Sequence, residues 1–234
     1  MKIETYALPR EVGELKGKNA VVLDVLRATT NIVLALNNGA KRVIPVAEVE
    51  EAYEYRQREA EVILGGERNR VLIPGFDLAN SPLEYTAAAV AGKTIVMTTT
   101  NGTVALKKAA GADRVLVGSF INMVSLSERV QSEAKDLVII CSGTKGKISL
   151  EDSLAAGYLL SLLRESADYE LDDFGIMACD LYDFYSSCLE RALCCSENGR
   201  SLISLGKKED IHWAARLNYC SLVPEMKDGI IRGR

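Results

Sequence analysis

The stretch that decides the fold is TIVMTTTNGTVALKKAAGADRVLVG, residues 94–118. It opens with a short apolar run that suits a buried strand (94–97) and continues through a polar loop (98–103). A helical segment that ends near a glycine follows (104–112), and a second apolar run closes the stretch (113–118). This order of strand, polar loop, helix and strand is typical of an α/β protein with a mostly parallel sheet.

The same order occurs earlier in the chain, which indicates an internal repeat. AVVLDV (20–25) has the pattern of a buried strand, LRATTN (26–31) that of a polar loop, and IVLALNNGA (32–40) that of a helix. The phrases GAKRVIPV (39–46) and GADRVLVG (111–118) then align without gaps, and each contains the strand that follows the helix.

Three further segments extend this pattern. A third strand, polar loop and helix are predicted within 136–163. Amphipathic helices are predicted at 48–60 and 122–134, at matching positions after the two repeated strands. We therefore predict a three-layer α/β/α fold with a mostly parallel or mixed sheet and an internal strand–loop–helix repeat.

The domain organisation is expected to be simple. From about Asp172 the sequence predicts helices around 179–195, but no further strand–loop–helix repeat. No linker rich in proline, glycine or serine divides the chain. We expect one compact α/β domain over 1–234, with possible sub-domains near 1–135 and 136–234.

Composition limits the partners and the location. A net charge of −4 over 234 residues gives no reason to expect nucleic acid or an anionic membrane as a partner. No apolar run approaches the roughly 20 residues that a membrane helix needs, and MKIETYALPR has no signal-peptide core. We expect a cytoplasmic protein whose six cysteines stay reduced. A homo-oligomer, taken as a dimer, is expected as well, although no motif specifies it.

One count limits the chemistry. His212 is the only histidine, which excludes a histidine-rich zinc cluster and a phosphohistidine mechanism with a second histidine. Acid–base or metal chemistry must therefore run mainly on carboxylates. Carboxylates with hydroxyls and water suit Mg²⁺, a hard cation.

The candidate site residues follow the predicted strands. In open α/β sheets ligands bind beyond the carboxyl ends of the strands, where helix N-termini attract anions. The loop TTTNGT is accordingly interpreted as one wall of an anion site. The residues that we place at this edge are Asp24, Arg27, Thr29, Thr30, the segment from Thr98 to Thr103, Cys141, Ser142, Gly143, Thr144, Glu151 and Asp152.

Each of these residues has a purely structural alternative. Serine, threonine and asparagine also cap helices and fill turns for local reasons. Asp24 ends an apolar strand, where an unpaired carboxylate is costly, so it needs a metal or a cation. Arg27 could be that cation in a structural ion pair. The adjacent Glu151 and Asp152 could simply favour the dipole of the helix that begins near them.

The segment 65–85, GGERNRVLIPGFDLANSPLEY, is dense in polar residues and in glycines and prolines that interrupt regular structure. Loops of this kind often carry function. Arg68 could bind a phosphate or sulfonate, and Glu67 and Asp77 could reach a cation. The alternative is an ordinary surface loop with solvated charges.

Several familiar phosphate-handling motifs are absent. GTKGKIS does not match the phosphate loop of nucleotide-binding proteins. A cysteine phosphatase would carry arginine where Lys147 follows Cys141, and lysine lacks the fork of donors that arginine presents. Asp24 is followed by Val25 and Leu26, which departs from the Asp-x-Asp pattern of haloacid-dehalogenase-type phosphatases.

Several long segments, taken in order, form a pattern over nearly the whole chain: VVLDVLRATTNI (21–32), ERNRVLIPGFDLANSP (67–82), TTTNGTVAL (98–106), CSGTKGKISLEDSLAAG (141–157), NGRSLISLG (198–206) and DIHWAARLN (210–218). These segments resemble the 2-phosphosulfolactate phosphatase family. Arg70 and Ala79 stand where that family pattern leads us to expect glycines, which puts the local loop geometry in doubt.

The resemblance implies an Mg²⁺-dependent hydrolase that converts 2-phosphosulfolactate into 3-sulfolactate and phosphate, a step associated with coenzyme M synthesis. It also implies an α/β sandwich unlike the common phosphatase folds. The substrate is a small polyanionic phosphate ester, and Mg²⁺ with arginines would neutralise its charge. The expected mechanism is in-line attack on phosphorus by a metal-activated water.

These considerations assign three sets of roles. The catalytic candidates are Asp24, Arg27, Glu151 and Asp152. The metal candidates are Asp24, Glu67, Glu151 and Asp152. The substrate-binding candidates are Arg27, Arg68, Thr99, Thr100, Asn101, Gly102, Thr103, Ser142 and Gly143.

Two other functions stay open at this point. The protein could be a phosphatase for a different small phosphorylated hydroxy acid. It could also be an anion-binding module without catalytic activity. Phosphate release from phosphosulfolactate would count against the second alternative.

We predict that Cys141 is not a nucleophile, because Lys147 replaces the arginine that a thiolate phosphatase requires. Cys141→Ser should keep most of the wild-type turnover, measured as phosphate release under saturating substrate. Trapping a phosphocysteine at Cys141 would contradict a mechanism in which water attacks phosphorus.

Overall fold

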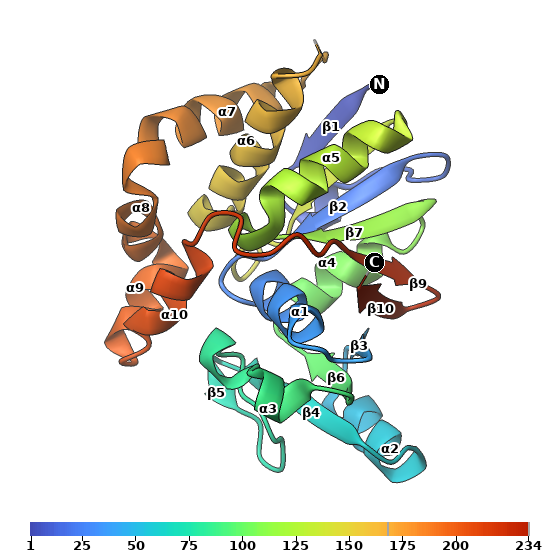
Figure 1. Ribbon diagram of the computed structural model, residues 1–234. Helices are drawn as coiled ribbons and strands as arrows, with labels where there is room; N and C mark the ends of the chain where they lie inside the picture. Colours follow the sequence, from blue (N-terminus) through green and yellow to red (C-terminus); the bar gives the residue numbers. More distant parts are fainter. Residues whose placement is uncertain (168, 234) are drawn as a thin grey trace.

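The computed structural model describes residues 1–167 and 169–233. Within these residues ten strands form one sheet: β1 Ile3–Tyr6, β2 Asn19–Leu23, β3 Arg42–Pro45, β4 Val62–Arg68, β5 Val71–Leu72, β6 Thr94–Thr98, β7 Arg114–Gly118, β8 Leu137–Cys141, β9 Pro224–Lys227 and β10 Ile230–Gly233. Their order across the sheet is β1-β8-β2-β7-β9-β10-β3-β6-β4-β5 (Figure 1). The prediction of an α/β fold with a mixed sheet is confirmed.

The helices of the described residues occupy the connections and most of the C-terminal third. Short 3-10 helices lie at Pro9–Glu11, Pro82–Glu84, Phe120–Asn122 and Ser186–Cys188. The α-helices are α1 Ala28–Asn37, α2 Val49–Arg58, α3 Ala87–Val90, α4 Gly102–Ala109, α5 Met123–Glu133, α6 Leu150–Arg164, α7 Asp173–Tyr185, α8 Leu189–Cys195, α9 Glu197–Ser204 and α10 Lys208–Ala214.

The predicted repeat is present and is longer than the sequence suggested. Each unit contains three strands and two helices: β2-α1-β3-α2-β4 in the first and β6-α4-β7-α5-β8 in the second. The predicted helices at 48–60 and 122–134 correspond to α2 and α5. A capping box between Glu48 and Glu51 starts α2, which fits the charged sequence there.

The two units interleave in the sheet. β2 of the first unit pairs with β7 of the second, and β6 of the second pairs with β3 of the first. The β9–β10 hairpin lies between them, antiparallel to β7 on one side and to β3 on the other. The order of the eight inner strands is therefore symmetric about this hairpin, and the two parallel groups run in opposite directions.

Sheet twist brings the carboxyl ends of these two groups to one place. Adjacent strands rotate by roughly 20–25°, so the five steps from β2 to β6 accumulate a rotation of more than about 100°. The first turns of α1 and α4 consequently meet. A Cβ placed on Gly102 would lie 2.5 Å from the Cβ of Ala28 and 2.8 Å from Oδ2 of Asp24.

Alternate residues of the strands face two layers of helices, as a three-layer fold requires. Val22 and Val117 pack with α1 and α4 on one face. Val21 and Leu116 pack with α5 and α6 on the other face, and Val96 packs toward α2 in a smaller cluster. Figure 1 shows α5 and α6 on the outer side of the strands β1, β2 and β7.

Two of the predicted polar loops are shorter than expected. The loops were placed at 26–31 and 98–103, but α1 starts at Ala28 and α4 starts at Gly102. The threonines of α1 are buried and hydrogen-bonded within the fold, so they extend the helix rather than the loop. The Thr29 hydroxyl accepts the N–H of Asp24 at 2.9 Å, and the Thr30 hydroxyl donates to the carbonyl of Val25 at 2.8 Å.

Two other regions also differ from the sequence-based expectation. The segment 65–85, expected as an irregular loop, begins with the second half of strand β4. In the C-terminal third the predicted helices are present, but β9 and β10 were missed. Their Asp228–Gly229 connection is a typical hairpin turn, whereas the four-residue strands carry too little apolar pattern to stand out.

No helix within the described residues is both long enough and apolar enough to cross a bilayer. The longest is α6, and it packs along α7 through Gly157. A Cβ at Gly157 would lie 1.9 Å from the carbonyl oxygen of Ala178 and 2.9 Å from the Cβ of Tyr182. Hydrogen therefore is the only side chain that fits between these two helices.

We predict that Gly157→Ala lowers the free energy of unfolding by about 1–3 kcal/mol, because the added methyl overpacks the contact with α7. At a helix position without close neighbours the same change would raise the free energy of unfolding by about 1 kcal/mol. The sign of the change therefore shows whether α7 packs tightly against Gly157. Urea denaturation measures it. Gly111→Ala is the control, because its Cβ would meet only the Leu15 Cβ, at 3.9 Å. A Gly157→Ala protein as stable as wild type would show that the helices separate freely.

Candidate active site

Strand register places polar residues at the meeting point of the two repeat units. Leu23 is paired with both Gly118 and Cys141, so β2, β7 and β8 end at one level. In the other group Thr98 is paired with Gly66. Asp24 follows β2 directly, Thr99 follows β6, and Glu67 stands next to Gly66 near the end of β4.

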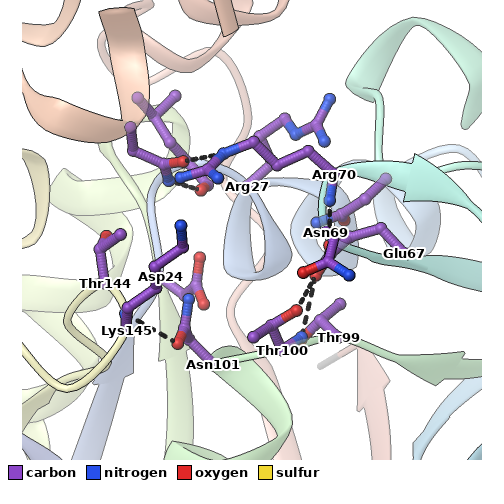
Figure 2. A pocket seen from close by; sticks show the side chains of 13 residues that line it. Asp24, Arg27, Glu67, Asn69, Arg70, Thr99, Thr100, Asn101, Thr144 and Lys145 are labelled. Carbon is purple, nitrogen blue, oxygen red and sulfur yellow. Dashed lines mark hydrogen bonds between the residues drawn. The ribbon is translucent and has the colours of Figure 1, made fainter. Parts of the chain in front are cut away.

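These strand ends surround a cavity of about 480 Å³, including the part that is open to solvent. Figure 2 shows side chains from several segments pointing into this space. The lining residues are Asp24, Leu26, Arg27, Glu67, Asn69, Arg70, Asn80, Thr99, Thr100, Asn101, Thr144, Lys145 and Asn198.

Asp24 is a buried carboxylate of the cavity lining. Its Oδ1 accepts the N–H of Ala28 at 3.2 Å, in the first turn of α1. Burial, and after it the negative charges of Glu151 and Glu67, raise the pKa of Asp24 to about 7. Asp24 can therefore change its charge near neutral pH, and an added cation would favour the ionised form.

Asp152 and Glu151 lie behind Asp24, outside the cavity lining. Both oxygens of Asp152 accept backbone N–H groups, from Val25 at 2.9 Å and from Gly143 at 3.0 Å. Asp152 thus ties the loop after β2 to the loop after β8. Burial, with the charges of Asp24 and Glu151, raises the pKa of Asp152 well above its usual range.

Glu67 faces Asp24 across the cavity and orders the neighbouring loops. Its Oε1 accepts both the N–H of Thr100 at 2.9 Å and the Thr100 hydroxyl at 2.8 Å. Its Oε2 accepts the N–H of Arg70 at 2.6 Å. Figure 2 shows the Thr100 contact, which joins the end of β4 to the loop after β6.

Three cationic side chains from residues 1–167 and 169–233 line the cavity. Arg27 forms a buried ion pair with Asp210 of α10, rather than with Asp24 as the structural alternative had it. Arg70 donates Nε to Oδ1 of Asn198 at 3.0 Å. Lys145 lies on the loop after β8, and its N–H donates to Oδ1 of Asn101 at 3.3 Å.

Arg70 stands where a glycine was expected, and its backbone conformation is one that glycine favours. Its φ is 65°, in the left-handed region that glycine adopts most readily. The loop therefore keeps a backbone that glycine would suit, and it adds a cation to the cavity.

Arg68, a predicted substrate-binding residue, is turned away from the cavity. Its Nη2 donates to the carbonyl of Ala47 at 2.7 Å and to the Thr98 hydroxyl at 2.8 Å. These contacts tie β4 to the ends of β3 and β6. Successive side chains of a strand point to opposite faces of the sheet, so Glu67 points into the cavity and Arg68 points to the other side.

Only part of the opening loop TTTNGT lines the cavity, namely Thr99, Thr100 and Asn101. Thr103 is buried and donates its hydroxyl to the carbonyl of Thr99 at 2.9 Å. Gly102 packs against Ala28 and Asp24 beneath the lining. The same holds for the loop after β8, where the predicted Ser142 and Gly143 are buried and the neighbouring Thr144 and Lys145 reach the cavity.

Several lining residues were missing from the predicted site. Arg70 was noted only as a departure from a family pattern, and no sequence signal connects Asn198 with residues more than a hundred positions earlier. Asn80 belongs to a segment that was singled out, although it was not assigned a role. Thr144 was placed at this edge of the sheet without a role, and it lines the cavity. The polar lining residues that were missed are Asn69, Arg70, Asn80, Lys145 and Asn198.

The cavity residues fit an Mg²⁺ ion that takes only a few of its ligands from the protein. In the described part of the chain, no group of three or more histidine, cysteine or acidic side chains is arranged to hold a metal. Mg²⁺, however, commonly takes only one or two carboxylates and completes its shell with water and substrate phosphate. Among the described residues, Asp24 and Glu67 are the two carboxylates that line the cavity.

The chain matches a protein-family model described as 2-phosphosulpholactate phosphatase over residues 6–229. It belongs to that family. A protein named probable 2-phosphosulfolactate phosphatase from Caldanaerobacter subterraneus subsp. tengcongensis is 44% identical over 99% of this chain and 98% of its own length. Proteins of the same name from Symbiobacterium thermophilum and Carboxydothermus hydrogenoformans are 42% and 41% identical, over 92% and 96% of this chain. They are covered over 94% and 93% of their own lengths.

The family prediction made from the sequence motifs is thereby confirmed, and with it the prediction that the chain belongs to a family of phosphoric monoester hydrolases. Family membership adds meaning to the geometry. In a member of a phosphatase family, a cavity that combines buried carboxylates with arginines and a lysine is the leading candidate for the active site.

We predict that Gly102→Val lowers both stability and activity. A side chain there would displace Ala28 and Asp24. We therefore expect the free energy of unfolding to fall by at least about 2 kcal/mol and kcat/KM to fall at least about tenfold. This differs from a role in direct ligand approach, which would spare stability. Gly111→Val, in the turn that follows α4, is the control. Denaturation and steady-state kinetics decide, and a stable, fully active Gly102→Val protein would contradict the packing argument.

Proposed function

We propose that this protein is an Mg²⁺-dependent phosphatase that hydrolyses 2-phosphosulfolactate to 3-sulfolactate and phosphate, as in coenzyme M biosynthesis. The observation that carries the proposal is the site at which Asp24, a buried carboxylate with a pKa raised to about 7, faces Arg27, Arg70 and Lys145. The names of the relatives support the same reaction.

The cationic side chains match the charge of this substrate. 2-Phosphosulfolactate carries a phosphate ester, a carboxylate and a sulfonate, so several negative charges must be bound together. Arginine pairs with such groups through two parallel N–H donors, and lysine acts as a point charge. Thr99 and Asn101 add neutral donors at the opposite wall.

Asp24 and Glu67 are the residues that would hold Mg²⁺. Oδ2 of Asp24 takes no hydrogen bond within the described residues, while both oxygens of Glu67 already accept backbone N–H groups. The chemistry that Mg²⁺ supplies when bound is neutralisation of phosphoryl charge and activation of a water. Asp152, whose oxygens are both occupied, holds the two loops that carry Asp24 and Thr144.

The residues of the chain then bind and orient the ester. The arginines and Lys145 stabilise the charge that develops on the phosphoryl oxygens during in-line attack by water. A leaving hydroxy acid with its own carboxylate and sulfonate would need cations beyond those on the phosphate. We propose that the three cations divide between the two ends of the substrate.

A phosphate-release assay tests the proposal. Wild-type protein is given 2-phosphosulfolactate and a panel of other phosphorylated hydroxy acids, each with Mg²⁺ or with a chelator. We expect Mg²⁺-dependent release that is fastest with 2-phosphosulfolactate. Faster turnover of another ester would correct the substrate and keep the reaction, whereas no release from any ester would favour an anion-binding module.

We predict that Asp24→Asn abolishes turnover and does not reduce stability. The asparagine keeps the acceptor for the Ala28 N–H but cannot attract a metal. In wild type the buried charge costs about 1.4 kcal/mol for each unit by which the pKa is raised. The metal-free variant should therefore be at least as stable as wild type in urea at pH 8. Asp180→Asn, on the exposed side of α7, is the control.

The same shift predicts the pH dependence. The pKa of Asp24 is raised in the folded state, so this group binds its proton more tightly there than in the unfolded chain. Metal-free wild type should lose stability as pH rises from about 4 to 7, and Asp24→Asn should show a shallower slope, to which Asp152 still contributes. Activity has the opposite sign, because only ionised Asp24 attracts the metal, and kcat/KM should fall below about pH 7. If kcat/KM stayed constant from pH 5 to pH 8, Asp24 would be excluded as the residue that attracts the metal.

A further inference from the structure

The helices α9 and α10 reach the edge of the cavity, although no role was predicted for this part of the chain. Each contributes one buried polar side chain, Asn198 from α9 and Asp210 from α10. Both side chains contact an arginine that lines the cavity. Figure 1 shows these helices at the end of the orange and red arm that follows α7.

Asp210 holds Arg27. The side chains of the two residues are each only 2% exposed, and they form an ion pair through Nη1 and Oδ2. The other oxygen of Asp210 accepts the Ser81 hydroxyl at 2.6 Å. Both oxygens of the carboxylate are thus occupied, and Asp210 offers Arg27 a fixed partner rather than a mobile one.

Asn198 holds Arg70 and the backbone next to Arg27. Its Oδ1 accepts Nε of Arg70 at 3.0 Å, and its Nδ2 donates to the carbonyl oxygen of Leu26. Lys207, which precedes α10, donates to the carbonyl of Arg70 at 3.2 Å. One short segment of the chain therefore fixes the side chain or the backbone of both arginines.

We infer that Asp210 and Asn198 are positioning residues of the site, which hold Arg27 and Arg70 in the orientation that binds the phosphate group of the substrate. This assignment rests on the proposed function, since it takes the arginines to bind the anion. It gives the C-terminal helices a defined part in catalysis.

The hydrogen-bond inventory of the arginines supports this assignment. A guanidinium has five N–H donors. Within the described residues Arg27 uses only Nη1, toward Asp210, and Arg70 uses only Nε, toward Asn198. The remaining donors of each arginine are left for a ligand. A free arginine would lose side-chain entropy when it binds an anion, and a held arginine has already lost it.

Binding of inorganic phosphate, measured by calorimetry on the full chain with Mg²⁺, tests the assignment. We expect Asp210→Asn to weaken phosphate binding at least about tenfold and Asn198→Ala at least about threefold, because a charged partner is worth more than a neutral one. Glu209→Gln and Glu197→Gln are matched controls, since each is exposed and adjacent to the tested residue. The controls should bind within about twofold of wild type.

A double-variant cycle separates positioning from general stability. If Asp210 acts through Arg27, Arg27→Ala/Asp210→Asn should bind phosphate no more weakly than Arg27→Ala alone. Should Asp210→Asn fail to fold, Ser81→Ala takes its place, because it loosens Asp210 without leaving Arg27 unpaired. That variant should weaken phosphate binding about threefold, and its effect should vanish in the Arg27→Ala background.

Two results would overturn the assignment. One is a folded Asp210→Asn protein that binds phosphate like wild type. The other is a double variant in which the losses of phosphate affinity caused by Asp210→Asn and by Arg27→Ala multiply. The outcome is independent of the phosphatase assay. If the wild-type protein hydrolyses no ester, but phosphate binding by the single and double variants follows the predicted pattern, the proposed function is refuted and the positioning role is supported.

Discussion

The packing of the first turns of α1 and α4 against each other, with Asp24 between them, is the constraint on which the rest of the structure depends. The contact allows no side chain at Gly102. It forms only because the two repeat units interleave around the β9–β10 hairpin and the sheet twists between them. Where the units meet, their strand ends face one another and leave the cavity. The site is therefore a consequence of how the repeat pairs with itself.

That arrangement places acids where the fold alone gains nothing from them. Asp24, Glu151 and Asp152 are all buried. Burial, and after it the charge of neighbouring carboxylates such as Glu151, raises the pKa of Asp24 and of Asp152. Two backbone N–H groups compensate Asp152, whereas Asp24 receives one hydrogen bond and faces the cavity. A buried carboxylate left this incompletely satisfied costs stability, and an incoming cation would offset the cost. The energetic weak point of the fold and the chemical centre of the site coincide at Asp24.

The repeat, the strands and the family were readable from the sequence because each depends on local pattern. The apolar runs, the phrase Gly-Ala-x-Arg-Val and the long motifs are contiguous. The details of the site were only partly readable. Of the residues proposed for the site, Asp24 and Asn101 line the cavity, whereas Arg68 does not, because strand alternation turns it away while Glu67 points inward. Nothing local could show that Asn198 reaches Arg70, since that contact is set by how the C-terminal helices fold back.

The two units have also diverged in a way that makes one site from a symmetric scaffold. The first unit and the segment after it supply the charged lining groups Asp24, Arg27, Glu67 and Arg70. At corresponding positions the second unit supplies hydroxyl and amide groups, with Lys145 as its one charged contribution to the lining in the described residues. A perfectly symmetric pair would place like charges opposite each other, and their repulsion would oppose the close approach of α1 and α4. Neutral donors on one side permit that approach, and they leave the charged side free to be ordered by α9 and α10.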